Sequence, residues 1–235
     1  MAREAADMVL KDDAFCTIVI AVEQGRVIFE NIRKFIIYLL SCNISEIMVV
    51  FAASIVDAPL PILPLQILFL NLVTDVFPAL ALGAGGGNPG LMEKPPRPSS
   101  EPILSKRGWY SVFGYGALIT FAVLLAFALS FKMLGMEQKQ AVTVSFLTLA
   151  LAQLWHVFNM RANGTTLFKN EIVENPYVWA ALGLCVLLLL AAVYVPLLSE
   201  VLKLTNPGLN GWILIIAASS IPCVAGQICK MFKRK

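Results

Sequence analysis

The chain has 235 residues, of which 58% are hydrophobic and 14% are charged, and its mean hydropathy is +0.78. This composition excludes an ordinary soluble globular domain and indicates a membrane protein. The net charge is only +3, and the basic residues lie at the ends of apolar segments. Membrane orientation explains this pattern better than nucleic-acid binding, so we expect no nucleic acid among the partners.

The first 34 residues are rich in charged side chains and precede the first long apolar run. Residues 8–10 could form a short strand, and Asp12 and Asp13 are suited to cap a helix. The apolar residues that follow recur at helical spacing. Because no proline interrupts the chain before Asp57, one helix is expected from about Ala14 through the first membrane span. It would protrude as a stalk, which is either a mechanical link to the cytoplasm or a plain juxtamembrane helix.

Six apolar runs are long enough to cross roughly 30 Å of hydrocarbon as helices. They cover residues 35–56, 62–83, 111–134, 141–159, 177–198 and 209–229. The expected fold is therefore an all-α membrane protein: a bundle of six transmembrane helices with a short cytoplasmic N-terminal stalk segment. Fifteen Lys and Arg residues lie on the side of the two termini and three on the other side, so the positive-inside rule places both termini in the cytoplasm.

Polar side chains interrupt two neighbouring spans. Asn71, Thr74 and Asp75 are spaced to share one face of a helix, and Asn43 and Glu46 share a face of the preceding span. A carboxylate at mid-bilayer costs roughly 2.5–3.5 kcal/mol and usually faces the bundle interior or an aqueous path. Since a short turn joins the two spans, we expect these side chains to meet in an all-oxygen cluster suited to a hard cation such as Ca²⁺. The alternative is a structural polar network that holds the two helices together.

Two further residues bear on this cluster. Pro78 should bend or unwind its helix and free backbone carbonyls, which could also bind a cation. Gln153 is the one strong polar group deep in the 141–159 span apart from hydroxyls. It could add an amide oxygen to the cluster or serve only in interhelical hydrogen bonding.

Motifs of other chemistries are absent from the sequence. It contains no phosphate-binding G-x-x-x-x-G-K-[ST], no G-x-S-x-G and no cluster of His and Cys ligands. The single histidine, His156, is expected at a membrane edge as a packing or anchoring residue. The cysteines form no C-x-x-C pair and are expected as small core residues rather than disulfide or zinc ligands; they are Cys16, Cys42, Cys185, Cys223 and Cys229.

Read in order, these segments resemble the C-terminal part of a P-type cation ATPase of the calcium-pump type. The stretch AREAADMVLKDDAFCTIVIAVEQGRVIFENIRKFI is similar to the end of the family's phosphorylation domain and the stalk of its fifth membrane helix. NLVTDVFPALALG resembles its sixth membrane helix, and MEKPPRP the cytoplasmic loop that follows. The resemblance implies four segments: 1–34 as the end of the phosphorylation domain and the stalk, 35–83 as the two helices with the ion site, 84–110 as a cytoplasmic linker, and 111–235 as four more membrane helices and a basic tail.

The resemblance also implies a set of metal ligands and no catalytic or cofactor-binding residue in this chain. The family's ligand positions match Asn43, Glu46, Asn71, Thr74, Asp75 and Gln153. At Gln153 the reticulum-type calcium pump has an acid, and this departure puts the strength or number of ion sites in doubt.

The resemblance implies the membrane half of an ATP-driven pump, with Ca²⁺ as the transported ion. The family's ATP-hydrolysing motifs are missing, so this chain alone is expected to have no ATPase activity, and ATP and Mg²⁺ would act only in the complete pump. The chain would be a fragment, a truncated reading frame or one piece of a split protein. Its expected partners are the bilayer and the missing N-terminal and catalytic part, and its expected location is a bacterial-type cell membrane. The alternatives are transport of Na⁺, K⁺ or Mn²⁺, and a non-transporting interaction or regulatory fragment.

Overall fold

In the structure, a computed structural model, all the secondary structure of the part of the chain that it describes is helical. This part comprises residue 9 and residues 14–55, 57–87, 90–98, 101–162, 165–166 and 169–232. The helices are α1 (Phe15–Ile55), α2 (Pro64–Leu70), the π-helical turn η1 (Asn71–Asp75), α3 (Val76–Gly83), η2 (Leu91–Glu93), α4 (Lys106–Lys132), α5 (Gln138–His156), η3 (Val157–Met160), α6 (Pro176–Tyr194), α7 (Pro196–Val201) and α8 (Gly208–Phe232). No strand occurs among these residues, and the prediction of a strand at residues 8–10 falls largely outside them.

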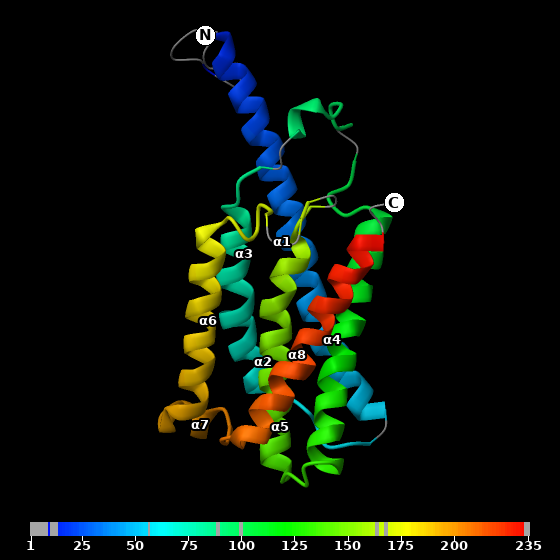
Figure 1. Cartoon of the computed structure of the whole chain (residues 1–235), viewed down its shortest axis with the longest axis vertical. Coiled ribbons are helices and arrows are strands. Elements are labelled where there is room, and N and C mark those ends of the chain that lie inside the picture. The colour runs from blue at the N-terminus through cyan, green and yellow to red at the C-terminus, as the bar shows by residue number, and fades with distance from the viewer. Residues whose placement is uncertain are drawn as a thin grey trace.

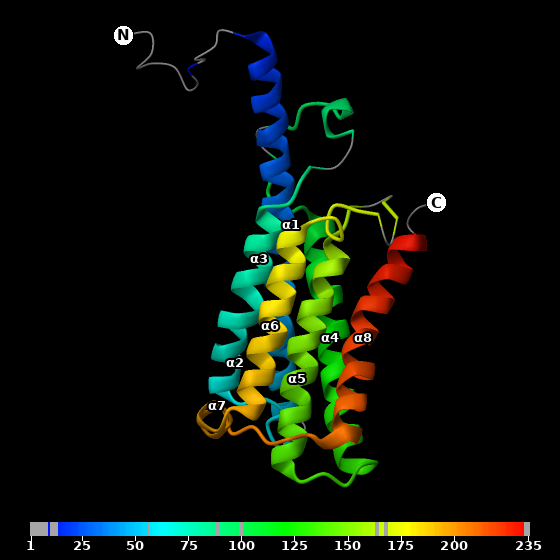
Figure 2. The same cartoon turned by 60° about the vertical axis from the view of Figure 1, so that its left-hand side comes forward.

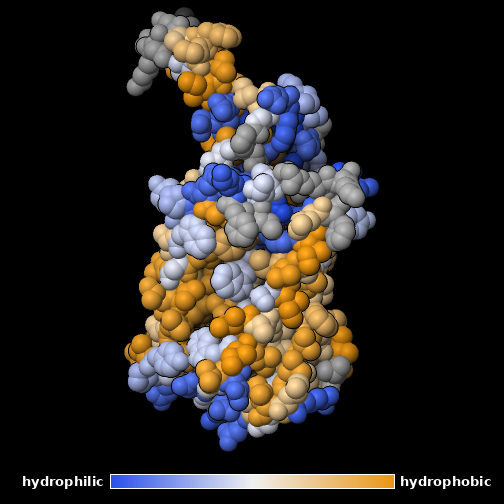
Figure 3. Space-filling model, viewed as in Figure 1, coloured by the Kyte–Doolittle hydropathy of each residue, from blue (hydrophilic) through white to orange (hydrophobic). Residues whose placement is uncertain are grey.

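Six of the described helical segments are long and apolar enough to cross a membrane. This confirms the expected all-α membrane fold and its six spans. Figures 1 and 2 show the spans running side by side, with α1 entering the bundle and α8 ending on the same side. On the face seen in Figure 3, apolar side chains form a wide belt across the bundle, and hydrophilic bands lie above and below it. The chain is therefore an integral, multi-pass membrane protein.

Helix α1 is a single unbroken helix of 41 residues, roughly 60 Å long at 1.5 Å per residue. About half of that length is enough to cross the hydrocarbon, so the N-terminal half projects beyond the bundle as the predicted stalk (Figure 1). Near its far end the chain reverses at Asp57, an exposed residue with φ 49°.

The connection between α3 and α4 is fastened to this stalk. Arg26 donates from Nη1 to the carbonyl oxygens of Leu91 and Lys94, at 3.0 and 2.7 Å. Asn31 Nδ2 lies 2.6 Å from the carbonyl oxygen of Gly85. The expected linker is thus anchored to α1, and α4 begins at Lys106, a few residues earlier than its apolar run indicated.

Caps and prolines set the helix ends. Ser105 Oγ accepts a hydrogen bond from the Gly108 amide at the start of α4, and Asn175 does the same for the Tyr177 amide before α6. The predicted end of the fifth span, residue 198, is too late. Pro196 forces Val195 into an extended conformation and ends α6 at Tyr194.

Helix α5 is the most enclosed span and packs against α4 and α8 (Figure 2). Its hydroxyl side chains are buried, and two of them bond within the helix: Thr143 to the carbonyl of Lys139, and Ser145 to that of Ala141, both at 3.0 Å. Because lipid offers polar groups no partners, an enclosed helix of this kind is where a buried amide such as Gln153 can be kept.

The cysteine prediction is correct only in part. All five thiols are free; Cys42 and Cys185 are buried and Cys223 is half-buried. Cys16 and Cys229 are exposed, so they are not core residues. Their environments differ because Cys16 lies on the projecting stalk and Cys229 on an outer face of α8.

Candidate cation site

The second span changes its helical form where its polar residues lie. Residues Asn71–Asp75 form a π-helical turn between α2 and α3. Such turns insert an extra residue into a helix and are frequent at functional sites. Thr74 and Asp75 are buried by this turn, and Asn71 is half-buried. Their side chains reach toward α1 and α5.

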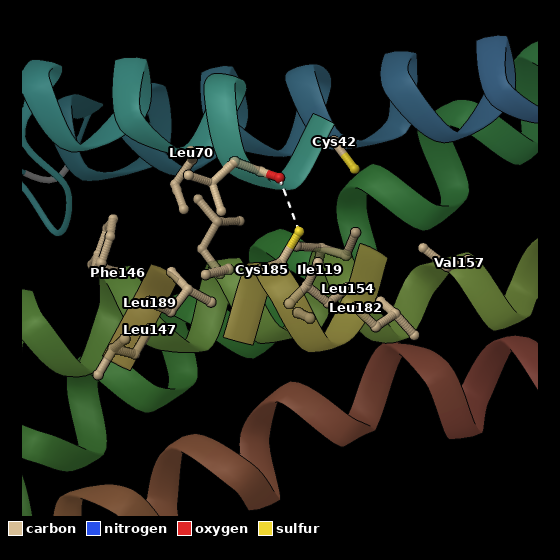
Figure 4. Packing of buried hydrophobic residues seen from close by; sticks show 14 of the residues in the cluster. Cys42, Leu70, Ile119, Phe146, Leu147, Leu154, Val157, Leu182, Cys185 and Leu189 are labelled. Atoms are coloured by element: carbon tan, nitrogen blue, oxygen red, sulfur yellow. Dashed lines mark hydrogen bonds between the residues drawn. The ribbon is translucent and has the colours of Figure 1, made fainter. Parts of the chain in front are cut away.

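Pro78 accounts for part of this geometry. It has no N–H, so the carbonyl of Thr74, four residues earlier, lacks its α-helical donor, and that of Val73, five residues earlier, lacks a π-helical one. Tyr38 Oη donates to the Thr74 carbonyl at 2.6 Å, and Cys185 Sγ to the Val73 carbonyl at 3.1 Å (Figure 4). Side chains of neighbouring helices thus supply donors to the two carbonyls that Pro78 leaves without a helical one.

Two carboxylates lie at the centre of the site. Asp75 Oδ2 accepts a hydrogen bond from Asn43 Nδ2 at 3.0 Å, which joins η1 to α1. The other oxygen, Asp75 Oδ1, is buried and has no hydrogen-bond partner within the described part of the chain. An unpartnered carboxylate oxygen in an apolar interior is costly unless a cation or proton compensates it.

The second carboxylate, Glu46, accepts from amides on two other helices. Gln153 Nε2 donates to Glu46 Oε1 at 2.9 Å. When the Asn71 amide nitrogen is turned toward it, that nitrogen lies 3.2 and 3.1 Å from the two Glu46 oxygens. The Thr74 hydroxyl donates to Gln153 Oε1 at 2.7 Å, so Gln153 bridges Glu46 and Thr74. The hydrogen bonds thus join the six predicted side chains in two groups: Asn43 with Asp75, and Glu46 with Asn71, Gln153 and Thr74. Asn43 and Glu46 are about one turn apart on α1, and Thr74 and Asp75 are consecutive in η1, so the two groups lie side by side as one polar cluster across α1, η1 and α5.

Most of the polar cluster is buried within the bundle, and the rest borders a cleft. Glu46 is 3% exposed, and Thr74 and Gln153 are 0% exposed. A cleft of about 530 Å³ runs along α1 and α2 and is lined by Asn43, Glu46, Asn71, Ser54 and apolar side chains. The polar cluster therefore has an open face between the first two spans.

The donor set is made of oxygens. Among the residues that the structure describes, no group of three or more His, Cys, Asp and Glu side chains lies close enough together to hold a metal ion. The candidate site instead combines two carboxylates with three amides and one hydroxyl, which suits a hard cation better than a soft transition metal.

Two residues near the site, Tyr38 and Cys185, were not predicted from the sequence. Tyr38 is fully buried and stacks on His156 with ring centroids 5.9 Å apart. Pro78 is the feature of the sequence that points to such residues, because its missing N–H leaves backbone carbonyls that need donors from facing helices. His156, the last residue of α5, is fully buried and also packs on Tyr115 with ring centroids 4.5 Å apart, which agrees with the expected packing role.

The sequence is similar to those of known proteins. The family model described as "Cation transporting ATPase, C-terminus" matches residues 59–232. A calcium-transporting ATPase of Bacillus subtilis is 40% identical over 94% of this chain and 25% of its own length. Calcium-transporting ATPase 1 of Bacillus cereus is 34% identical over 100% of this chain and 28% of its own length. P-type sodium-transporting ATPase4 of Plasmodium falciparum is 45% identical over 55% of this chain and 10% of its own length.

The chain spans about a quarter of the length of the calcium-transporting relatives. The match extends through all the membrane helices described above, including α1, which lies before the family-model segment. The chain therefore belongs to the cation-transporting ATPase family, of which it represents the C-terminal membrane region.

Proposed function

We propose that this chain is the cation-translocating membrane region of an ATP-driven P-type pump that carries Ca²⁺ out of the cytoplasm. The observation that carries the proposal is the pair of buried carboxylates, Glu46 and Asp75, each of which accepts a hydrogen bond from a side-chain amide within the same polar cluster. Two carboxylates balance the charge of one divalent ion, and neutral oxygens complete the 6–8 ligands that Ca²⁺ takes.

The side-chain amides of the polar cluster can change which atom they present to a cation. Asn43 and Gln153 each direct an NH₂ group at a carboxylate. An amide presents an oxygen in place of nitrogen after a half-turn about its last bond. We infer that cation binding turns these amides, so that NH₂ groups which partly offset the carboxylate charges are replaced by ligand oxygens.

Helix α1 supplies the mechanical link. One helix carries both the projecting stalk and the two residues Asn43 and Glu46, so a displacement of the stalk would move these ligands relative to Asp75. We propose that residues 1–34 join a catalytic part that uses ATP and Mg²⁺, that 35–83 carry the ion site, that 84–110 form a linker and that 111–235 support the site. The open cleft beside Asn71 is where we place membrane helices from the rest of the pump.

We further propose that both termini lie in the cytoplasm and that the membrane is a bacterial-type cell membrane. Among the described residues, ten Lys and Arg residues lie on the stalk side and three on the other, which supports this orientation. The calcium-transporting relatives from two Bacillus species support the choice of membrane.

The test is cation uptake into inside-out vesicles by a complete pump in which this chain forms the C-terminal region. We expect ATP-dependent uptake of Ca²⁺. A second candidate ion is Na⁺, because a relative named as a sodium-transporting ATPase is 45% identical over 131 residues. Uptake of Na⁺ with none of Ca²⁺ would select that candidate, and uptake of neither would contradict the proposal.

A further inference from the structure

A cationic cavity lies at the membrane boundary where the stalk leaves the bundle. It has a volume of about 390 Å³ and is formed by α1, α4, α8, the end of η3 and the connection that carries Lys94. Its charged lining consists of Arg33, Lys34, Lys94, Arg161, Lys230 and one carboxylate, Glu30.

Three of these cations pair with carboxylates: Lys34 with Glu171 at 2.9 Å, Arg33 with Glu101 at 2.7 Å, and Lys94 with Glu30 at 3.3 Å. Of these carboxylates Glu30 belongs to the cavity lining, so the described lining holds five cations and one carboxylate.

Arg161 is the most deeply placed of these cations. The residue is 5% exposed, and its guanidinium donates to Gln227 Oε1 at 2.7 Å and to the Thr165 carbonyl at 2.5 Å. Of the partners that the structure describes for it, none is a carboxylate. A buried guanidinium with neutral acceptors has charge and donor capacity left for an anion, and it binds phosphate oxygens in a charge-assisted geometry.

A second hollow continues from this cavity into the apolar belt. It measures about 660 Å³ between α4 and α8, and it shares Ser111, Tyr115 and Cys229 with the cationic cavity. Gly114 and Leu118 line it on α4, and Gly226 lines it on α8. A side chain built at Gly114 would meet no atom within 4 Å, so the groove there is open.

We propose that the cavity and the groove together form a binding site for an anionic phospholipid. The phosphate of the head group would occupy the cationic cavity beside Arg161, and an acyl chain would lie in the groove along Gly114. Basic pockets between transmembrane helices at a membrane surface are suited to anionic head groups. The groove favours a lipid over a free anion, since a free anion has no part to place among apolar side chains.

The experiment is a titration of the purified chain in detergent with dioleoylphosphatidylglycerol and with dioleoylphosphatidylcholine, read by native mass spectrometry. The wild type should prefer the anionic lipid. Lys94→Gln with Lys230→Gln should lower that preference on the order of twenty-fold, since each basic residue near the surface contributes about five-fold. The control is Lys132→Gln with Lys203→Gln at the opposite membrane boundary, which should leave the preference unchanged.

A second pair of variants tests the groove without touching any charge. Gly114→Leu should fill the groove and abolish the preference. Gly183→Leu on α6 is the matched control, because that position also has no atom within 4 Å of an added side chain. Both changes replace a helical glycine on an open face, so neither should impair folding.

Equal affinity of the wild type for the two lipids would overturn the proposal. So would unchanged preference in Gly114→Leu or equal loss in Gly183→Leu. A titration with inorganic phosphate distinguishes the other anion source: thermal stabilisation equal to that by phosphatidylglycerol, and insensitive to Gly114→Leu, would assign the cavity to a free anion instead.

Discussion

The side-chain amide of Gln153 on α5 donates to Glu46 on α1, with 2.9 Å between Nε2 and Oε1. The same amide accepts from the Thr74 hydroxyl at 2.7 Å. One neutral side chain therefore joins three segments of the bundle at the candidate cation site. Both readings of Gln153 made from the sequence, ligand and interhelical hydrogen bond, remain compatible with this geometry, and substitution can separate them.

Gln153→Glu should make the stability of the chain depend on cations. The new carboxylate would face Glu46 at hydrogen-bond distance, and two like charges in a buried site repel unless a cation lies between them. We expect a lower melting temperature without Ca²⁺, a larger rise on adding Ca²⁺ than in the wild type, and tighter or more numerous ion binding in a complete pump. Thermal unfolding with and without Ca²⁺ measures the first two effects, and equilibrium binding measures the third.

Gln66→Glu is the control for this prediction. Gln66 is also fully buried and lies at the start of α2, where it donates to the Leu202 carbonyl at 2.9 Å, away from the site. It should destabilise the chain without any rescue by Ca²⁺. Equal responses to Ca²⁺ in both variants would show that Gln153 has only a packing role.

Tyr38→Phe should destabilise the bundle by about 1 kcal/mol, because the buried Thr74 carbonyl loses its donor. Pro78 cannot replace that donor. Unfolding in mixed detergents measures the change. Tyr110→Phe is a suitable control, since Tyr110 is 79% exposed. A loss no larger than that of the control would mean that the Tyr38 hydroxyl does not support the π-helical turn.

The orientation of the chain can be tested with its own thiols. Cys16 is exposed on the stalk, and the proposed topology places it in the cytoplasm. A membrane-impermeant maleimide should therefore label the chain in inside-out vesicles but not in intact cells. Lys203→Cys, at an exposed position in the connection after α7, should become labelled in intact cells. Labelling of the unaltered chain from outside would reverse the proposed topology.

Hydropathy and charge were sufficient for the large features of the fold. The lengths of the apolar runs predicted the six spans. The absence of proline before Asp57 predicted the continuous stalk. The short turn between the first two spans predicted that Glu46 contacts the helix that carries Asp75. The π-helical turn could not be predicted in the same way. Its residues keep an ordinary helical pattern, and its form depends on bonds from Tyr38 and Cys185 on other helices. Tertiary contacts of this kind leave no periodic signal in the sequence.

The candidate site shows the same division. The residue types and their spacing predicted which side chains gather, and the six named residues do lie in one polar cluster, in which hydrogen bonds join Asn43 with Asp75 and the other four with one another. The direction of each amide could not be predicted, because it depends on which neighbour lies opposite. Asn43 and Gln153 thus present nitrogen to the carboxylates, an arrangement that becomes visible only once the helices are packed.

The ligand role of Asp75 gives the most direct test of the proposed function. Asp75→Asn keeps the size of the side chain and one oxygen but removes a charge that balances a divalent ion. In a complete pump carrying this region, it should remove most cation-dependent turnover while the protein still folds. A purely structural carboxylate predicts the opposite: a neutral amide is easier to bury, so stability would hold or rise and transport would survive.

Glu46→Gln should behave like Asp75→Asn, because both carboxylates belong to the same polar cluster and each would supply one of the two charges. Asp57→Asn provides the control, since Asp57 is exposed in the turn after α1. Cation transport and thermal stability should be measured together in matched membranes for all three variants. The ligand assignment requires lost transport with retained stability at Asp75 and Glu46, and near wild-type values at Asp57. Wild-type transport by Asp75→Asn would refute it, because Glu46 would then supply one charge of the two that balance a divalent ion.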